Sequence, residues 1–247
     1  MINENPKISC YCATYDRPLI LEESIYSFLN QNYQNKELII VNDCKEQNLI
    51  FEHPQVKIYN FKDRIDKIGT KFNIAAQMCT GEILMPWDDD DIYLPWKMEV
   101  SLKLLKNGIF HTNQAFIETK PKELSFTKNL FHCNLAVEKT IFEDIGGYEE
   151  ENRATIDTDL FAKLRSKHGN FSFEIPNQDL FYIYRWSTVD CLHLSTIAPK
   201  ADENIQTITE KIHKSKKTFQ TGDIKLNPKW RYDYVKISQE FLKNQTS

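Results

Sequence analysis

The stretch EILMPWDDDDIYLP, residues 82–95, joins an apolar run to four consecutive aspartates. Ile83, Leu84 and Met85 predict a buried strand, and the apolar residues at 92–94 predict that the chain returns to the core directly after the aspartates. Neighbouring carboxylates repel one another by about 1 kcal/mol per pair in water, and by several times that in a partly buried site. We therefore expect the loop to hold a cation. The alternative interpretation is a plain solvated loop.

The chemistry of the loop favours one kind of cation. Carboxylate oxygens suit Mg²⁺ or Mn²⁺, which share their remaining coordination positions with water and with substrate phosphates. The spacing of the aspartates is not that of an EF-hand, which makes a site for calcium alone the weaker alternative. The sequence thus predicts a metal–phosphate site at residues 88–91.

The residues before this stretch predict a mostly parallel sheet. Apolar runs and helical spacing predict, in chain order, a strand at 7–15, a helix within 19–33, strands at 36–43 and 56–61, and a helix at 70–79. This order is typical of an α/β fold in which helices connect parallel strands. In such sheets ligands bind beyond the carboxyl ends of the strands. Asp16, Arg17, Asn42 and Asp43 fall there together with the four aspartates.

The pattern changes after Pro95. We expect a helix at 95–108, a strand at 108–119, a strand and short helix within 129–148, a helix at 155–169, strands at 180–186 and 191–195, and an amphipathic segment at 232–244. We divide the chain into one domain at 1–195, with halves at 1–98 and 99–195. Residues 196–247 form a polar, Lys-rich C-terminal extension with a terminal helix.

The composition excludes several classes of protein. With 31 basic and 35 acidic residues the net charge is −4, so no basic field is present for binding nucleic acid. No apolar run reaches the roughly 18 residues of a membrane span, and the first ten residues do not read as a signal peptide. The six scattered cysteines favour reduced thiols over disulfides or a zinc site. We expect a cytoplasmic protein.

Four stretches resemble, in the same order, the inverting family 2 glycosyltransferases of the GT-A fold. ISCYCATYDRP resembles the opening strand and turn of that family, and SIYSFLNQNYQNKELIIVND resembles its next helix and strand. KFNIAAQMCTGEILMPWDDDDIYLP resembles the helix, strand and Asp-x-Asp loop, and GGYEEENRATIDTDLFAKL resembles the segment that carries the catalytic base. The resemblance implies a nucleotide-sugar-binding half at 1–98 and an acceptor-binding half at 99–195.

The resemblance also implies roles for individual residues. Asp43 matches the aspartate that bonds the nucleotide base. Asp90 matches the leading metal ligand, and Asp88 matches the aspartate near the ribose or the metal. Asp157 matches the general base, with Asp159 as the alternative. Each of Asp43 and Asp157 also has a purely structural interpretation as a turn or helix cap.

Further residues complete the expected site. The nucleotide-binding set also includes Thr14, Tyr15, Arg17, Lys71 and Asp89, and His193 is an additional candidate metal ligand. Trp186 is a candidate platform for stacking against a sugar. The chain departs from the family at Asn42, Ala13 and Ile156. The last departure, beside the expected base, leaves the choice between Asp157 and Asp159 open.

The expected reaction needs a metal and one base. Displacement of a nucleoside diphosphate builds negative charge on the leaving phosphate, which a divalent cation neutralises, and a carboxylate removes the proton from the attacking hydroxyl. The competing hypotheses are a nucleotidyltransferase, which should show a Gly-rich phosphate loop that ATYDRPLILEE lacks, and a non-catalytic nucleotide- or metal-binding module.

The expected partners follow from the resemblance. They are a nucleotide-sugar donor, with a UDP-sugar favoured, and a saccharide or lipid-linked acceptor in polysaccharide or glycolipid synthesis. The lysines within residues 211–217 suggest contact with anionic lipid at the inner face of the membrane, although a solvated surface is the alternative.

Overall fold

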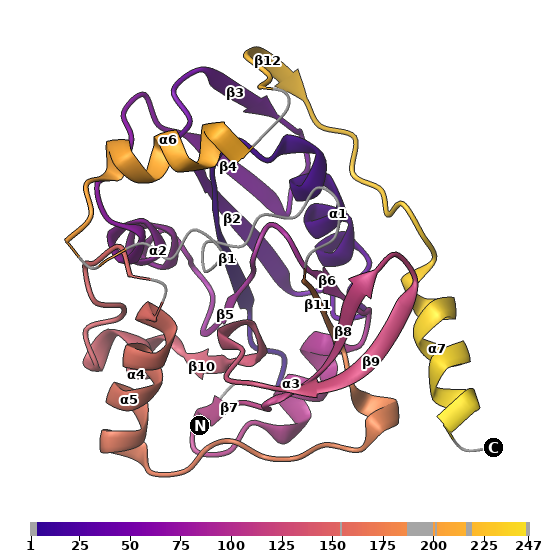
Figure 1. Ribbon diagram of the computed structural model, residues 1–247. Coiled ribbons are helices and arrows are strands. Elements are labelled where there is room, and N and C mark those ends of the chain that lie inside the picture. The colour runs from indigo at the N-terminus through magenta and orange to yellow at the C-terminus, as the bar shows by residue number, and fades with distance from the viewer. Residues whose placement is uncertain (1–3, 154, 187–199, 201, 216–218, 246–247) are drawn as a thin grey trace.

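A central sheet organises the part of the chain that the computed structural model describes, residues 4–153, 155–186, 200, 202–215 and 219–245. Its six strands are, in spatial order, β4 (Val56–Asn60), β2 (Lys36–Asn42), β1 (Ile8–Thr14), β5 (Ile83–Pro86), β10 (Ala136–Glu138) and β7 (Ile109–Phe110) (Figure 1). The first four are parallel, and β10 is antiparallel to both of its neighbours. The mostly parallel α/β sheet expected from the sequence is confirmed.

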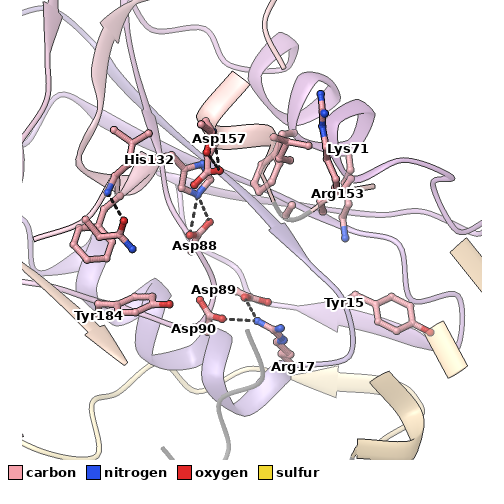
Figure 2. Close-up of a pocket in the computed structure, with 18 of the residues that line it drawn as sticks. Tyr15, Arg17, Lys71, Asp88, Asp89, Asp90, His132, Arg153, Asp157 and Tyr184 are labelled. Atoms are coloured by element: carbon pink, nitrogen blue, oxygen red, sulfur yellow. Dashed lines mark hydrogen bonds and ion pairs between the residues drawn. The ribbon is translucent and has the colours of Figure 1, made fainter. Parts of the chain in front are cut away.

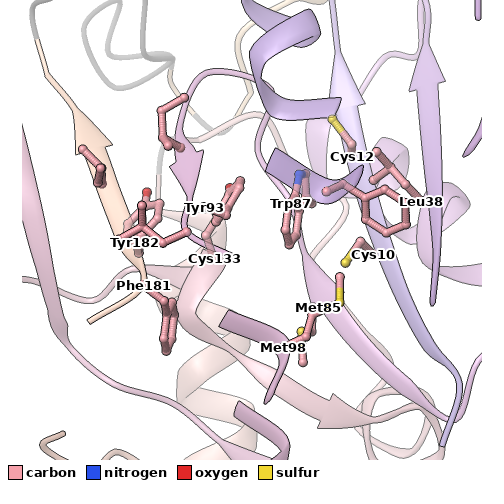
Figure 3. Close-up of a cluster of buried hydrophobic side chains, with 14 of the residues drawn as sticks. Cys10, Cys12, Leu38, Met85, Trp87, Tyr93, Met98, Cys133, Phe181 and Tyr182 are labelled. Atoms are coloured by element: carbon pink, nitrogen blue, oxygen red, sulfur yellow. The ribbon is translucent and has the colours of Figure 1, made fainter. Parts of the chain in front are cut away.

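Helices cover both faces of the sheet because successive residues of a buried strand point to opposite sides. Cys10 and Cys12 of β1 join the core beneath α1 (Pro18–Leu29) and α3 (Lys97–Leu104), whereas Tyr11 joins the opposite core. That second core lies beneath α2 (Ile68–Gln77), α4 (Lys139–Asp144) and α5 (Ile156–His168). Figure 3 shows Cys10, Cys12 and their neighbours in the first core. Each fully buried Leu, Ile or Phe contributes about 1.5–3 kcal/mol.

The four aspartates connect two sheets. β5 ends at Pro86, and β6 (Ile92–Tyr93) begins directly after the aspartates in a second sheet. The order of that sheet is β6, β11 (Tyr182–Arg185), β8 (Gln114–Lys120) and β9 (Glu123–Lys128). Trp87, Tyr93, Phe181 and Tyr182 fill the core between the two sheets (Figure 3). Both ends of the acidic loop are therefore fixed by packed strands, as the apolar residues on either side of it predict.

The structure differs from the expected elements in several places. The strand expected at 108–119 is two strands, β7 and β8, because the chain leaves the central sheet between them and enters the second sheet. β3 (Gln47–Ile50), β9, α6 (Ile205–Ser215) and β12 (Gly222–Lys225) were not expected, since they are short or mostly polar. The helix expected to reach Gly108 ends at Leu104. Short 3₁₀ helices, η1 (His132–Asn134) and η2 (Asn177–Asp179), complete the connections.

The described residues after 200 pack against both halves of the domain. β12 (Gly222–Lys225) pairs with β3 in parallel, and α7 (Tyr234–Gln245) places Phe241 against Phe116 and Phe126 of the second sheet. Figure 1 shows the chain from β12 to α7 passing α1. Within the described residues no helix has the length and apolar character needed to cross a membrane. Five cysteines are buried free thiols, and Cys191 lies outside the described residues.

Candidate active site

A cavity of about 410 Å³ opens where β1 and β5 end. Its volume lies within the range of about 300–1,000 Å³ typical of small-molecule sites. Residues of the acidic loop, the β1–α1 turn, α2, η1 and the start of α5 line the cavity (Figure 2). The carboxyl ends of the parallel strands therefore converge on one site, as the sequence predicts.

Arg17 holds two of the aspartates on one side of the cavity. Its guanidinium donates to Asp89 at 2.9 Å and to Asp90 at 2.8 Å, and the Thr14 hydroxyl donates to Asp89 at 2.6 Å. Burial raises the pKa of Asp89, and the neighbouring Asp90 and Asp88 add to this effect, while Arg17 and Thr14 oppose it. Thr14 and Arg17 thus contact the acidic loop itself, and Arg17 supplies part of the positive charge that the clustered carboxylates require.

Asp91 has a different environment from Asp88 and Asp90. It does not line the cavity, and its two oxygens accept hydrogen bonds from the Tyr182 hydroxyl at 2.5 Å and from the backbone N–H of Arg185 at 2.8 Å. Asp91 therefore fixes the loop to β11, and the carboxylates of Asp88, Asp89 and Asp90 are left to face the cavity.

His132 and Cys133 were missed by the sequence analysis. His132 Nε2 lies 2.9 Å from Asp88 Oδ2, and the Cys133 thiol donates to the same oxygen at 2.8 Å. Burial alone would lower the pKa of His132, but the Asp88 carboxylate raises it to about 9. The Tyr148 hydroxyl, 3.2 Å from Nδ1, holds the other side of the ring. No local pattern reveals this pair, because the fold brings together residues 44 positions apart.

The residues of the loop fit a hard divalent cation. Carboxylate oxygens of Asp88, Asp90 and Asp91 lie within 4.8 Å of one another, and Asp88 and Asp90 also line the cavity. An oxygen donor set that opens on a cavity is the arrangement that Mg²⁺ or Mn²⁺ uses when it shares its coordination with phosphates. His193, the other candidate ligand, lies outside the described residues.

Asp43 directly follows β2 and does not itself line the cavity, whereas its partners Lys71 and Arg64 do. Its Oδ1 accepts a hydrogen bond from the ammonium of Lys71 at 2.6 Å, and its Oδ2 accepts from Arg64 and from the backbone N–H of Ile65. Burial would raise the pKa of Asp43, but Lys71 and Arg64 together hold it below its usual value. Lys71 also donates to the carbonyl of Thr14, which ties β1 to β2 beneath the cavity.

Replacing Lys71 with Met should destabilise the fold. The lysine is 2% exposed, and its loss leaves Asp43 with Arg64 as its only described cationic partner. Because breaking a buried ion pair leaves a poorly compensated charge, we expect the free energy of unfolding to fall by roughly 3 kcal/mol. Urea denaturation measures this loss. Lys67→Met, at the preceding turn, is the matched control, and equal stability of the two variants would contradict the role assigned to Lys71.

Tyr15 meets helix α6 at the edge of the cavity. Its hydroxyl lies 3.0 Å from His213 Nε2, and the guanidinium of Arg64 stacks on its ring at 3.7 Å. Ile212 of α6 also lines the cavity. A helix beyond the expected domain boundary at residue 195 therefore forms part of the wall beside Asp43.

The two candidate bases at the start of α5 are placed differently. Asp157 is half-buried, lines the cavity and accepts a hydrogen bond from the backbone N–H of Thr158 at 2.8 Å. Asp159 forms an ion pair with Arg153 at 2.8 Å and is not among the cavity residues. Figure 2 shows Asp157 on the side of His132 opposite to Asp88. This geometry favours Asp157 as the group that meets a substrate.

Aromatic rings form another wall. Phe131, Tyr182 and Tyr184 line the cavity, and Trp186 stacks on Tyr184 with ring centroids 5.8 Å apart. The aromatic faces can pack against the apolar part of a ligand, while the tyrosine hydroxyls can form hydrogen bonds with its polar groups. Trp186 itself supports Tyr184 from outside the cavity.

The mostly parallel α/β sheet, with an acidic loop at the carboxyl ends of its strands, has the architecture of the GT-A glycosyltransferase fold. The chain belongs to glycosyl transferase family 2, whose family model matches residues 9–162. It is 26% identical over 200 residues to an uncharacterized glycosyltransferase of Rickettsia typhi, and the matched region covers 69% of this chain and 63% of that protein. It is also 26% identical over 196 residues to the putative colanic acid biosynthesis glycosyl transferase WcaA of Escherichia coli, covering 68% and 69% of the two chains.

Solved structures share the fold. S. aureus TarS 1–349 in complex with UDP-GlcNAc has a TM-score of 0.61 and 13% identity, with 77% of this chain and 61% of that chain covered. The mannosyltransferase PcManGT from Pyrobaculum calidifontis, in complex with GDP-Man and Mn²⁺, has a TM-score of 0.54 and 17% identity, with 75% and 58% covered. At these identities the likeness supports the GT-A fold alone.

Proposed function

We propose that the protein is a metal-dependent, inverting glycosyltransferase that moves a sugar from a nucleotide-diphosphate donor to an acceptor hydroxyl. One observation carries the proposal: the acidic loop and Asp157 open on the same cavity from different elements. A metal-binding module needs only the loop, whereas transfer also needs a group that can accept a proton.

The donor fits along the line from Asp43 to the acidic loop. Asp43, held by Lys71 and Arg64, is proposed to lie beside the nucleotide base, while Asp88 and Asp90 hold Mn²⁺ or Mg²⁺. The cation would neutralise charge on the leaving diphosphate. Thr14, Tyr15 and Arg17 come from the turn between these two groups, and Asp89 anchors that turn to the loop.

Asp157 is proposed to act as the general base. The acceptor hydroxyl would transfer its proton to the Asp157 carboxylate while its oxygen forms a bond to the anomeric carbon. The bond from that carbon to the diphosphate oxygen breaks on the opposite side, and the nucleoside diphosphate leaves with the electron pair. A single displacement inverts the anomeric centre and needs no covalent intermediate.

The substrates are proposed at the level of chemical class. We favour a UDP-sugar, a choice consistent with a structural neighbour solved with UDP-GlcNAc, although another was solved with GDP-Man. A saccharide or lipid-linked acceptor would suit the wall of Phe131, Tyr182 and Tyr184. A role in polysaccharide synthesis is in keeping with a relative named for colanic acid biosynthesis. A cytoplasmic location and membrane contact through residues 211–217 stay predictions.

Calorimetric titration tests the donor class. Of UDP, GDP and dTDP, we expect UDP to bind more tightly with Mn²⁺ than in EDTA, because the bound cation then joins the carboxylates of the acidic loop to the diphosphate. Selective binding of GDP or dTDP would change the donor but keep the reaction. If no nucleotide binds with or without Mn²⁺, the proposed function is wrong.

A further inference from the structure

The acidic loop is held from behind by groups that do not line the cavity. The hydroxyl of Ser24 in α1 donates to the carbonyl of Asp88 at 2.7 Å, and Arg185 Nε donates to the carbonyl of Asp90 at 2.6 Å. The backbone N–H of Arg185 also bonds Asp91. These contacts fix the backbone of the loop and thereby the directions in which its carboxylates point.

Arg185 is itself held by a buried carboxylate. Arg185 and Glu23 are each 1% exposed, and Arg185 Nη1 lies 2.6 Å from Glu23 Oε2. A buried guanidinium is costly unless it is paired with good geometry. The position of Arg185, and with it the carbonyl of Asp90, therefore depends on where Glu23 places its carboxylate.

The C-terminal segment, residues 219–245, completes this cluster. Arg231 donates to Glu23 three times, through its backbone N–H at 2.8 Å and through Nε and Nη2 at 3.0 and 2.9 Å. The indole of Trp230 bonds the hydroxyl of Ser27 one turn further along α1 at 2.9 Å. Glu23 therefore lies between a guanidinium that faces the loop and one that comes from the C-terminal segment.

The start of the same segment reaches the turn that carries Arg17. β12 pairs with β3, and Gln47 of β3 bonds both the carbonyl of Gln220 at 2.9 Å and the carboxylate of Asp16 at 2.8 Å. Asp16 has a φ of 55°, in the left-handed region that is uncommon for residues other than glycine, so this turn needs such support. The C-terminal segment is thus linked to the loop and to Arg17 by two independent routes.

We propose that Arg231 and Glu23 are positioning residues that set the geometry of the metal-binding loop through Arg185. The inference rests on the proposed function, because it assigns the loop to a metal and diphosphate. Residue 231 lies outside the region 9–162 that matches the family, which makes this support a feature of the chain beyond its family core.

Arg231→Met tests the proposal, because Arg231 is 43% exposed in its side chain and its removal leaves the Arg185–Glu23 pair in place to support folding. UDP binding is measured by calorimetry with Mn²⁺ and again in EDTA. We expect about tenfold weaker binding with Mn²⁺, since loss of an outer partner of a metal site typically costs 10–100-fold in affinity. Binding in EDTA, through the Asp43 side, should be unchanged. Arg231→Lys, which keeps the charge, should recover part of the loss.

The control is Lys236→Met, which removes one positive charge from the exposed face of α7. A purely structural role for Arg231 would lower the unfolding temperature without changing the ratio of the two affinities. Equal affinity ratios in Arg231→Met and Lys236→Met would overturn the proposal, and if Arg231→Met fails to fold, the same comparison is decided with Arg231→Lys. Failure of the wild type to bind UDP, GDP or dTDP at all would instead count against the proposed function.

Discussion

Asp90→Asn should abolish the Mn²⁺-dependent part of nucleotide binding. Asp90 lines the cavity together with Asp88, and its Oδ2 accepts a hydrogen bond from Arg17, so this carboxylate already lies beside a positive charge. Asparagine keeps an oxygen that Arg17 can bond but removes the charge that a hard cation requires. We expect affinity for UDP with Mn²⁺ to fall by roughly 100-fold or more, beyond the effect of losing an outer partner, and calorimetry measures the change.

The fold should tolerate this substitution. Relief of repulsion from the neighbouring carboxylates offsets the weaker bond to Arg17, and we expect the metal-free free energy of unfolding to change by no more than about 1 kcal/mol. Asp144→Asn, which removes an exposed carboxylate at the end of α4, should bind like the wild type. Retained Mn²⁺ dependence in Asp90→Asn would mean that Asp90 is not a ligand of the metal.

Most of the central sheet was predictable because β1, β2 and β5 are buried on both faces. Residues 36–42 of β2 are buried throughout. Apolar runs of this length that alternate with helical patterns predict parallel strands connected by helices. The same order of elements predicts which strand ends meet, which is why Asp43 and the acidic loop were expected at one edge. Lys71 was expected at the nucleotide, and its ammonium bonds Asp43 beneath the cavity.

The parts that were missed depend on contacts between distant residues. His132 meets Asp88 and Arg231 meets Glu23 only after the chain has folded. Neither His132 nor Arg231 belongs to a sequence motif or to a periodic apolar pattern that could have revealed the contact. β12 and β3 are edge strands of four residues each, too short for alternation to be informative. The polar composition of residues 196–247 predicted a C-terminal extension. Composition alone could not predict that Arg231 of this extension bonds the carboxylate of Glu23, which is almost fully buried.

The arrangement of charge suggests why the loop carries four aspartates. Asp91 is used to fix the loop to β11, and Asp89 holds Thr14 and Arg17. Asp88 and Asp90 line the cavity and belong to the candidate metal group, and Asp89 also lines the cavity while it holds the turn. A run that is electrostatically unfavourable as a whole is thus divided between anchoring and ligand binding.

Asp157→Asn should leave nucleotide binding intact and remove turnover. Asp157 lines the cavity, and the oxygen that accepts the Thr158 N–H can be supplied equally by asparagine, so the start of α5 should keep its conformation. The amide cannot accept the proton of an attacking hydroxyl. General-base catalysis typically contributes about 10²–10⁴-fold, and we expect a loss of turnover in that range. Release of nucleoside diphosphate from a panel of sugar nucleotides, with and without saccharide acceptors, measures it.

Asp159→Asn is the matched variant, two residues away on the same helix. It loses the half-exposed ion pair with Arg153, which should cost no more than about 1 kcal/mol of stability, and its turnover should stay within a few-fold of the wild type because its carboxylate does not reach the cavity. Full activity in Asp157→Asn together with loss of activity in Asp159→Asn would move the base to Asp159. Loss of activity in both, with nucleotide binding preserved, would mean that Arg153 must be held by Asp159 for the cavity to work.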